Sequence, residues 1–431
     1  MSRLLRLPGK VWGQWRLLRR DPEAWGRNLL QFTDPARFEQ RLLDIAAQPS
    51  LQLRIETEQA AALNVLQPRL APDAMTGGPN TNILLAALVA ERGVPVRIVT
   101  SQGGRGTDGA WFSSHVAALL GRPVPPSLSV ADAADPARPA SIGADDLWLA
   151  THWTTAEALR PVLPRMRRPD FLYLVQDFEP GFYPWSSNYA LATATYAMPH
   201  RAIFNEQFLA DYVRAMRPGR NADPDFLAAS CKVFEPAVDR RVFYPPAGRR
   251  DGRRRLLFYA RPTNPRNLFG IGVAALRAAI AAGIFDAAWE FVGIGGRGSV
   301  PPIALGGGHA LRPEPWDSYE AYAETLRRGD VLLCPMLSPH TSYPVLEMAA
   351  CGGKVVTNIF GPKTEAALAA LSPDILGVDP SPQGFADGLR LALSRLDEAR
   401  ADRLRLPSDW QDALSETVDW TVAALAAEGK A

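Results

Sequence analysis

The chain has 431 residues, more than one hydrophobic core usually organises, so two domains of roughly 200 residues each are expected. Its 47 Lys plus Arg residues against 45 Asp plus Glu residues give a net charge of +2, which does not favour binding to nucleic acid. No apolar run approaches the roughly 18 to 20 residues of a membrane span, and the N-terminus lacks the apolar stretch of a signal peptide. We therefore expect a cytoplasmic protein.

The first 20 residues carry an uneven charge. They contain six basic residues and no acidic one, with leucines and tryptophans between them. Such a segment suits the surface of a membrane, and the alternative is a helix that packs on the body of the protein. Residues 1–50 are predicted to be a basic amphipathic helical segment, with peripheral contact to the inner face of the membrane through residues 1–20 as one of these two interpretations.

Short apolar runs then alternate with stretches of helical pattern, which is typical of βαβ units with mostly parallel sheets. Two sets of strands are expected. The first set lies at residues 63–66, 94–100, 147–150, 171–175, 201–204 and 232–234. The second set lies at residues 256–260, 289–292, 309–312, 330–335, 354–357 and 375–378.

The segment between the two sets, 244–255, is rich in Pro, Gly and Arg, which suits a linker. The predicted fold class is therefore α/β, with two Rossmann-like domains whose parallel sheets face each other across a cleft. Residues 122–145 are rich in Pro, Ala and Asp and are expected to form an exposed loop. The expected units are a helical segment, an N-terminal domain, a C-terminal domain and a helix that packs back on the N-terminal domain, at residues 1–50, 51–245, 246–408 and 409–431.

A pair of glycines, Gly77 and Gly78, follows the first expected strand and its exit loop. Glycines allow close backbone approach, and Asn80 or Thr81 is expected to cap a helix that begins at about Asn82. The free N–H groups of such a helix start can bind an anion. The alternative is a simple turn from strand to helix.

His152 ends a later strand at the edge of the cleft, where it either bonds a substrate hydroxyl or leaving phosphate or has a structural role. Asp177 and Glu179 follow the next strand in a loop rich in aromatic residues, which include Tyr183 and Trp185. Aromatic rings and carboxylates commonly bind the apolar faces and the hydroxyls of sugars. These four loop residues are candidates for binding an acceptor, and the alternative is a rigid loop packed on the core.

Arg261 and Arg266 lie five residues apart across a turn after the first strand of the second half. Two permanent cations there suit a diphosphate leaving group, and the alternative is a solvated surface pair. A second loop, after another buried strand, contains Ser342, Tyr343 and Glu347. We expect Glu347 to begin a helix and to face the same crevice, although a carboxylate also suits the first turn of a helix.

The three cysteines, Cys231, Cys334 and Cys351, are odd in number and widely spaced, so reduced thiols are expected. The five histidines include no pair at the spacing of metal ligands. No metal and no cofactor are expected.

Four segments together resemble the retaining GT-B glycosyltransferases of family 4, and among them the WsaF-type rhamnosyltransferases of surface-glycan assembly. They are GGPNT, YLVQDFEPGFYPWSSNYALATATY, ARPTNPRNLF and SYPVLEMAACGGKVVTN. The resemblance covers roughly residues 60–425. It implies an N-terminal acceptor domain and a C-terminal nucleotide-sugar domain.

By the same resemblance, Arg261 and Arg266 match the basic pair on the donor diphosphate, and Glu347 matches the carboxylate that binds the nucleoside sugar. Gly78 matches the loop under the diphosphate, and His152 loosely matches a histidine near the transferred sugar. The donor-binding residues are then expected to be Gly77, Gly78, Asn80, Thr81, Ser342 and Tyr343.

One position departs from the family. Family members typically have two glutamates eight residues apart, and eight residues before Glu347 this chain has Pro339, with His340 beside it. The missing carboxylate usually contacts the donor hexose, so a 6-deoxy sugar donor such as dTDP-L-rhamnose is consistent with the change. The predicted function is transfer of a sugar, with retention of anomeric configuration, from a nucleotide-sugar donor to a glycan or lipid-linked glycan acceptor.

Two other classes of function stay open at this point. One is a nucleotide-sugar epimerase or hydrolase of the same fold. The other is a non-catalytic nucleotide-sugar-binding scaffold of a glycan-assembly complex.

Overall fold

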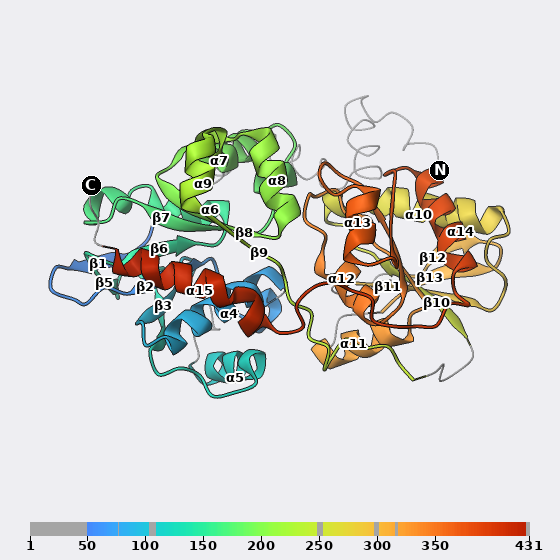
Figure 1. Cartoon of the computed structure of the whole chain (residues 1–431), viewed down its shortest axis with the longest axis horizontal. Coiled ribbons are helices and arrows are strands. Elements are labelled where there is room, and N and C mark those ends of the chain that lie inside the picture. Colours follow the sequence, from blue (N-terminus) through green and yellow to red (C-terminus); the bar gives the residue numbers. More distant parts are fainter. Residues whose placement is uncertain are drawn as a thin grey trace, which may run out of the picture.

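The computed structural model describes residues 50–75, 77–102, 109–247, 253–296, 301–314 and 318–427. The segment expected at 1–50 lies outside this part except for its last residue, so its two interpretations stay open. Two seven-stranded sheets form two α/β domains that lie side by side, with the N-terminal domain on the left of Figure 1. This arrangement confirms the predicted fold class.

The N-terminal sheet has the order β4-β3-β2-β6-β7-β8-β9, and all its strand pairs are parallel. A separate two-stranded parallel sheet joins β1 to β5. The strands of this half are β1 (Leu53–Glu56), β2 (Leu63–Gln67), β3 (Val96–Thr100), β4 (Leu128–Asp132), β5 (Ala140–Gly143), β6 (Leu147–Ala150), β7 (Phe171–Val175), β8 (His200–Asn205) and β9 (Cys231–Phe234).

The C-terminal sheet has the order β12-β13-β11-β10-β14-β15-β16 and is parallel apart from the pair of β12 with β13. Side chains of β10 alternate between its two faces, since Leu256 and Phe258 join one core cluster and Leu257 joins the other. The strands are β10 (Arg254–Tyr259), β11 (Trp289–Ile294), β12 (Ile303–Gly306), β13 (His309–Pro313), β14 (Val331–Leu333), β15 (Lys354–Asn358) and β16 (Ile375–Val378).

Helices cover both faces of each sheet. The N-terminal half contains α4 (Gly77–Glu91), α5 (Gly109–Leu120), α6 (Trp153–Leu159), α7 (Ser187–Ala194), α8 (Gln207–Met216) and α9 (Pro224–Ser230). The C-terminal half contains α10 (Phe269–Ala281), α11 (Tyr319–Arg328), α12 (Tyr343–Ala350), α13 (Glu365–Leu371) and α14 (Pro382–Ser394), and the final helix is α15 (Trp410–Ala426). Helices α4, α5 and α15 share one core cluster with the N-terminal sheet, and α6 and α8 share the other.

All the strands expected from the sequence are present, with ends that differ by up to two residues. The interpretation of residues 122–145 as an exposed loop is wrong, because β4 and β5 form there. Most residues of β4 are only partly buried, so its sequence carries no strong apolar signal.

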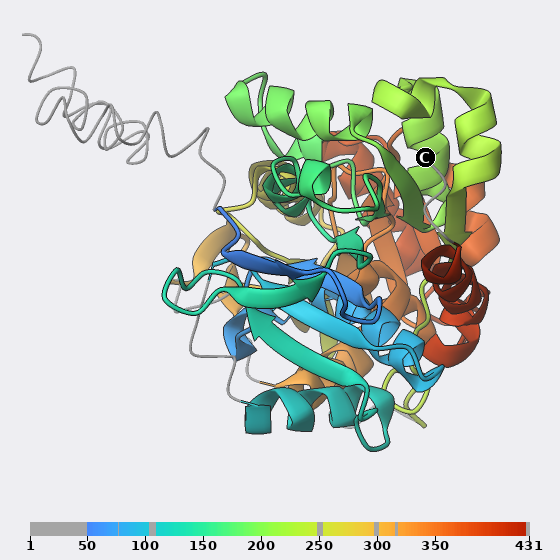
Figure 2. The same ribbon diagram turned by 90° about the vertical axis from the view of Figure 1, so that its left-hand side faces the viewer.

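Helix α15 follows the C-terminal domain along the chain and returns to pack against α4 of the N-terminal domain (Figures 1 and 2). Leu414, Val418 and Leu425 join the core cluster of that domain. Arg168 fixes the end of the helix, since its guanidinium donates to the carbonyl oxygens of Ala424 at 3.1 Å and of Leu425 at 2.6 Å. A cation at this end also meets the negative pole of the helix.

We predict that Arg168→Ala lowers the free energy of unfolding by about 2 kcal/mol, because it removes two charge-assisted hydrogen bonds from buried carbonyl groups. Urea unfolding monitored by circular dichroism measures the change. The neighbouring Arg167 is a matched control, since it is exposed and pairs with the exposed Asp145. Arg167→Ala is expected to change the free energy by less than about 0.5 kcal/mol. Equal losses in both variants would contradict the role of Arg168.

Candidate functional site

Loops from the carboxyl ends of both sheets meet between the domains. Tyr343, the first residue of α12, contacts the start of α4, with its hydroxyl 3.0 Å from the Thr81 hydroxyl. The amide of Asn205, at the end of β8, donates to the same Tyr343 oxygen at 3.0 Å. A Cβ atom on Gly77 would lie 2.5 Å from the Tyr343 ring, so this approach requires glycine. Three expected donor residues, Gly77, Thr81 and Tyr343, are therefore in contact.

The predicted start of the helix that follows Gly77 and Gly78 is wrong. Helix α4 begins at Gly77, so Asn80 and Thr81 lie inside its first turns and do not cap it. Pro79 is compatible with this, because proline is tolerated in the first turn of a helix. Asn80 bonds His115 of α5 at 2.9 Å, while a Cβ atom on Gly78 would lie 3.2 Å from the Gln176 side chain.

Asp177 connects the N-terminal domain to the C-terminal domain. One carboxylate oxygen accepts a hydrogen bond from the Ser338 hydroxyl at 2.7 Å, and the other forms an ion pair with Arg266. The Arg266 guanidinium also lies 4.2 Å from the centre of the Phe182 ring. Asp177 was expected to bind an acceptor, but in this structure it bonds the expected diphosphate-binding arginine. The other arginine, Arg261, donates to the Tyr259 hydroxyl at 3.4 Å.

Glu206 forms a second connection, which the sequence analysis missed. Its carboxylate accepts from the backbone N–H of Thr341 at 2.6 Å and from the Thr341 hydroxyl at 2.8 Å. Glu206 has a φ of 80°, a conformation that non-glycine residues rarely adopt, and burial raises its pKa to about 8. Its place directly after an expected strand was the available signal, but no motif marked it.

Lys363 supports the same loop from the C-terminal side. Its ammonium donates to the carbonyl oxygens of Met336 at 3.1 Å and of His340 at 3.5 Å. Burial lowers the pKa of Lys363 to about 8. Ser342, another expected donor residue, has a φ of 81°, and its N–H donates to Nδ1 of His340 at 2.9 Å. The loop is thus fixed from both domains.

The expected catalytic histidine, His152, caps α6 through its Nδ1 atom, which accepts from the Thr154 N–H at 3.2 Å. Its Nε2 atom lies 3.8 Å from Glu179, whose other oxygen accepts from the Trp153 N–H at 2.5 Å. Burial lowers the pKa of His152 to about 4 and raises that of Glu179 well above its usual value. His152 is therefore uncharged at neutral pH, and burial favours the protonated form of Glu179.

The two candidate aromatic residues of the same loop, Tyr183 and Trp185, lie in different surroundings. The Tyr183 hydroxyl accepts from the indole N–H of Trp153 at 3.1 Å, so it packs against α6. Trp185 is 93% exposed. The loop thus brings Glu179 and Tyr183 together at α6, whereas Trp185 points to solvent.

Glu347 lies in the middle of α12 and does not begin it, which corrects the expectation from the sequence. It is buried, and its carboxylate accepts from the Tyr322 hydroxyl at 2.7 Å. Burial raises the pKa of Glu347 to about 7, so the group is close to half protonated at neutral pH.

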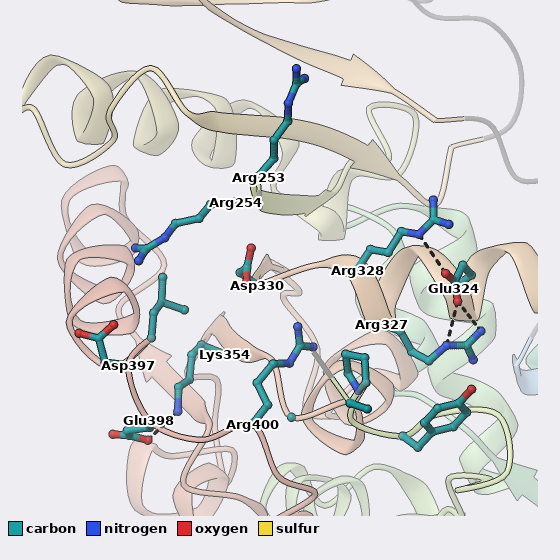
Figure 3. A pocket seen from close by; sticks show the side chains of 15 residues that line it. Arg253, Arg254, Glu324, Arg327, Arg328, Asp330, Lys354, Asp397, Glu398 and Arg400 are labelled. Carbon is teal, nitrogen blue, oxygen red and sulfur yellow. Dashed lines mark hydrogen bonds and ion pairs between the residues drawn. The ribbon is translucent and has the colours of Figure 1, made fainter. Parts of the chain in front are cut away.

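A cavity of about 790 Å³ lies at the opposite, amino-terminal edge of the C-terminal sheet (Figure 3). Several of its cations already have acidic partners: Arg327 and Arg328 bond Glu324, and Lys354 bonds Glu398. None of the expected site residues lines it. Across the part of the chain that the structure describes, no group of three or more His, Cys, Asp or Glu side chains is placed to bind a metal ion. Nor does any helix in that part combine the length and apolar character needed to cross a bilayer.

We predict that Glu206 makes stability depend on pH. Its pKa is raised in the folded state from 4.5 to about 8, so the folded state binds this proton more tightly between those values. The free energy of unfolding of the wild type should therefore fall, relative to Glu206→Gln, as pH rises from about 4.5 toward 8. Glutamine keeps an acceptor oxygen for Thr341 but does not titrate.

Chemical denaturation of both proteins at several pH values tests this. Lys363 has the opposite effect on the free energy of unfolding above about pH 8, because its pKa is lowered in the folded state from 10.5 to about 8. The comparison is therefore confined to lower pH. A constant difference between wild type and variant from pH 4.5 to 8 would show that folding does not raise the pKa of Glu206.

Two sequence models of one family match the chain. They are the WsaF N-terminal domain, at residues 62–207, and the WsaF C-terminal domain, at residues 254–390. The O-antigen biosynthesis protein RfbC of Myxococcus xanthus is 35% identical over 288 residues, which make up 64% of this chain and 20% of that protein. The chain thus corresponds to about a fifth of the length of this relative.

Solved structures share the two-domain fold. Sucrose-phosphate synthase of Thermosynechococcus elongatus gives a TM-score of 0.58 at 13% identity, over 85% of this chain and 100% of that one. HepE of Anabaena, in complex with UDP-glucose, gives a TM-score of 0.54 at 13% identity, over 85% of this chain and 99% of that one. The starch synthase IV catalytic domain of Arabidopsis thaliana, bound to ADP and acarbose, gives a TM-score of 0.52 at 11% identity, over 86% of this chain and 100% of that one. The chain belongs to the WsaF family and has the fold of the GT-B glycosyltransferases.

Proposed function

We propose that this protein transfers a sugar from a nucleoside diphosphate to a hydroxyl group of a growing bacterial surface glycan. The observation that carries the proposal is the contact between loops at the facing carboxyl edges of the two sheets, where Tyr343 bonds Thr81 and Asn205 and Arg266 pairs with Asp177. In open α/β sheets, ligands bind at such edges. The relative from Myxococcus xanthus is named for O-antigen biosynthesis, and HepE was solved with a nucleotide sugar, which supports this class of substrate.

In the proposed reaction, the bond between the sugar and the diphosphate breaks as a hydroxyl of the acceptor attacks. Negative charge grows on the departing diphosphate while the sugar becomes oxocarbenium-like. The guanidinium groups of Arg261 and Arg266 and the free N–H groups at the start of α4 would stabilise that charge. No metal ion is part of the proposed reaction, because these groups offer the positive potential that it requires.

Glu347 is the proposed ligand of the nucleoside sugar, since its carboxyl lies in α12 beside Tyr322. His152 would face the transferred sugar as an uncharged hydrogen-bonding group, because burial lowers its pKa to about 4. The aromatic loop that follows β7, with Asp177, Glu179 and the exposed Trp185, is the proposed acceptor side.

The proposed donor is dTDP-L-rhamnose, and retention of configuration is proposed with it. Support for the donor comes from Pro339, which stands where the family usually has a carboxylate for a hexose hydroxyl. The acceptor is proposed to be a glycan or a lipid-linked glycan at the inner face of the membrane.

A panel of nucleotide sugars tests the donor. We expect dTDP-L-rhamnose to raise the melting temperature more than UDP-glucose at equal concentration, since a ligand stabilises the folded state in proportion to the logarithm of its saturation. Turnover with the preferred donor, and NMR of the anomeric proton of the product, then test transfer and retention. Strong preference for a UDP-hexose would overturn the proposed donor, and hydrolysis without transfer to any acceptor would favour a hydrolase.

We predict that Arg261→Ala and Arg266→Ala each lower kcat by about 10²-fold, by analogy with the loss of one donor to a developing oxyanion. Steady-state assays with the preferred donor measure this. Arg277→Ala is the control, because Arg277 is exposed on α10 and donates to the Ala304 carbonyl, away from the expected site residues. Wild-type rates in both variants would refute the assignment of the two arginines.

A further inference from the structure

His340 carries a buried hydrogen-bond donor without a partner. The side chain is 8% exposed, and its Nε2 atom bonds nothing among the residues that the structure describes. The other ring nitrogen, Nδ1, accepts the N–H of Ser342 at 2.9 Å and is therefore unprotonated. Burial lowers the pKa of His340 to about 4, so the ring is neutral and its proton lies on Nε2.

Asn205 carries a buried acceptor without a partner, and the surrounding bonds fix which atom it is. Thr81 donates its hydroxyl proton to the Gly77 carbonyl at 3.0 Å, so the Tyr343 hydroxyl donates to Thr81. Tyr343 must then accept from Asn205, which orients the amide nitrogen toward Tyr343. The amide oxygen of Asn205 is left without a partner among the described residues.

Both groups adjoin Tyr343, at the contact between the domains. The His340 ring centre is 5.6 Å from the Tyr343 ring centre, and Asn205 bonds the Tyr343 hydroxyl. Buried polar groups in proteins are almost always hydrogen-bonded, so an unpaired donor and an unpaired acceptor that adjoin the same tyrosine indicate a ligand that offers both functions. A hydroxyl group does so, because it accepts through its lone pairs and donates its proton.

The position within the loop indicates which part of a ligand comes here. The N–H of His340 donates to the Ser338 hydroxyl, and Ser338 bonds Asp177, the partner of Arg266. His340 is therefore connected, through Ser338 and Asp177, by three successive contacts to the arginine proposed to bind the diphosphate. In a nucleotide sugar, the group next to the diphosphate, on the side away from the nucleoside, is the transferred sugar.

We propose that the Nε2–H group of His340 and the amide oxygen of Asn205 bind hydroxyl groups of the transferred sugar and so determine which donor the protein accepts. This proposal rests on the proposed function, because it assumes a nucleotide-sugar donor. It assigns sugar recognition to two residues outside the expected donor-binding set, one in each domain.

Binding of dTDP-L-rhamnose and of bare dTDP, measured by calorimetry, tests the proposal. His340→Phe keeps an aromatic ring but lacks the N–H, and it should weaken binding of dTDP-L-rhamnose about tenfold, as expected for one lost hydrogen bond. Its affinity for dTDP should change less than about twofold. His340→Gln, which keeps an N–H near the place of Nε2, should recover most of the loss. Asn205→Ala should show the same selective loss if the His340 variants do not fold.

Equal weakening of dTDP and dTDP-L-rhamnose would overturn the proposal, since it would indicate a structural role or a contact to the diphosphate. Unchanged binding of both ligands would also overturn it. If the wild-type protein binds neither of these ligands nor UDP-glucose, the proposed function fails, and that result is distinct because it appears before any variant is made.

Discussion

Parallel strands end at one edge of a sheet, and both sheets of this chain turn that edge toward the other domain. The cross-domain contacts therefore come from loops that follow strands: those after β2, β7 and β8 meet those after β10 and β14. No single element of either domain contains the site. It exists only where the two edges meet, and helix α15 helps to hold them together by packing the end of the chain onto the first domain.

Burial at this contact changes the chemistry of its titratable groups. The pKa values of Glu206 and Glu347 are raised to about 8 and about 7, while that of His340 is lowered to about 4. Desolvation is the largest cause in each case, because it disfavours the charged form. The groups consequently act mainly as hydrogen-bonding groups, and the guanidinium groups of Arg261 and Arg266 are the cations proposed to bind an anion. This separation of roles suits the proposed donor, which consists of a neutral sugar and a charged diphosphate.

The sequence was sufficient for the strands that are short apolar runs bounded by polar residues. It missed β1, β4, β5 and β12, whose residues are partly exposed or flanked by Pro, Ala and Asp. It also placed two helix starts too far along the chain, because α4 opens on Gly-Gly-Pro and α12 opens on Tyr-Pro, and such residues indicate a turn when they are read locally. Only the contact with Tyr343 reveals why Gly77 has no side chain.

Partners across the domains could not be predicted in the same way. Asp177 and Arg266 are 89 residues apart, and Glu206 and Thr341 are 135 apart, so no local pattern connects them. Asp177 and Arg266 were recognised as candidates by their place after strands, whereas Glu206 and Thr341 were not, and both pairings depend on how the two domains dock. The unpaired atoms of His340 and Asn205 could not be predicted from the sequence either. Which atom is left unpaired depends on the hydrogen bonds that the surrounding residues make in the folded protein.

The ion pair of Asp177 with Arg266 has a consequence for the energetics of the proposed donor complex. A phosphate that takes this place on Arg266 exchanges one anion for another and does not neutralise a bare cation. The net electrostatic gain is then the difference between two similar interactions, so donor affinity should respond to ionic strength less than the charge of a diphosphate suggests. If such a phosphate displaces the carboxylate of Asp177, the hydrogen bond from Ser338 to Asp177, which joins the two domains, is lost as well.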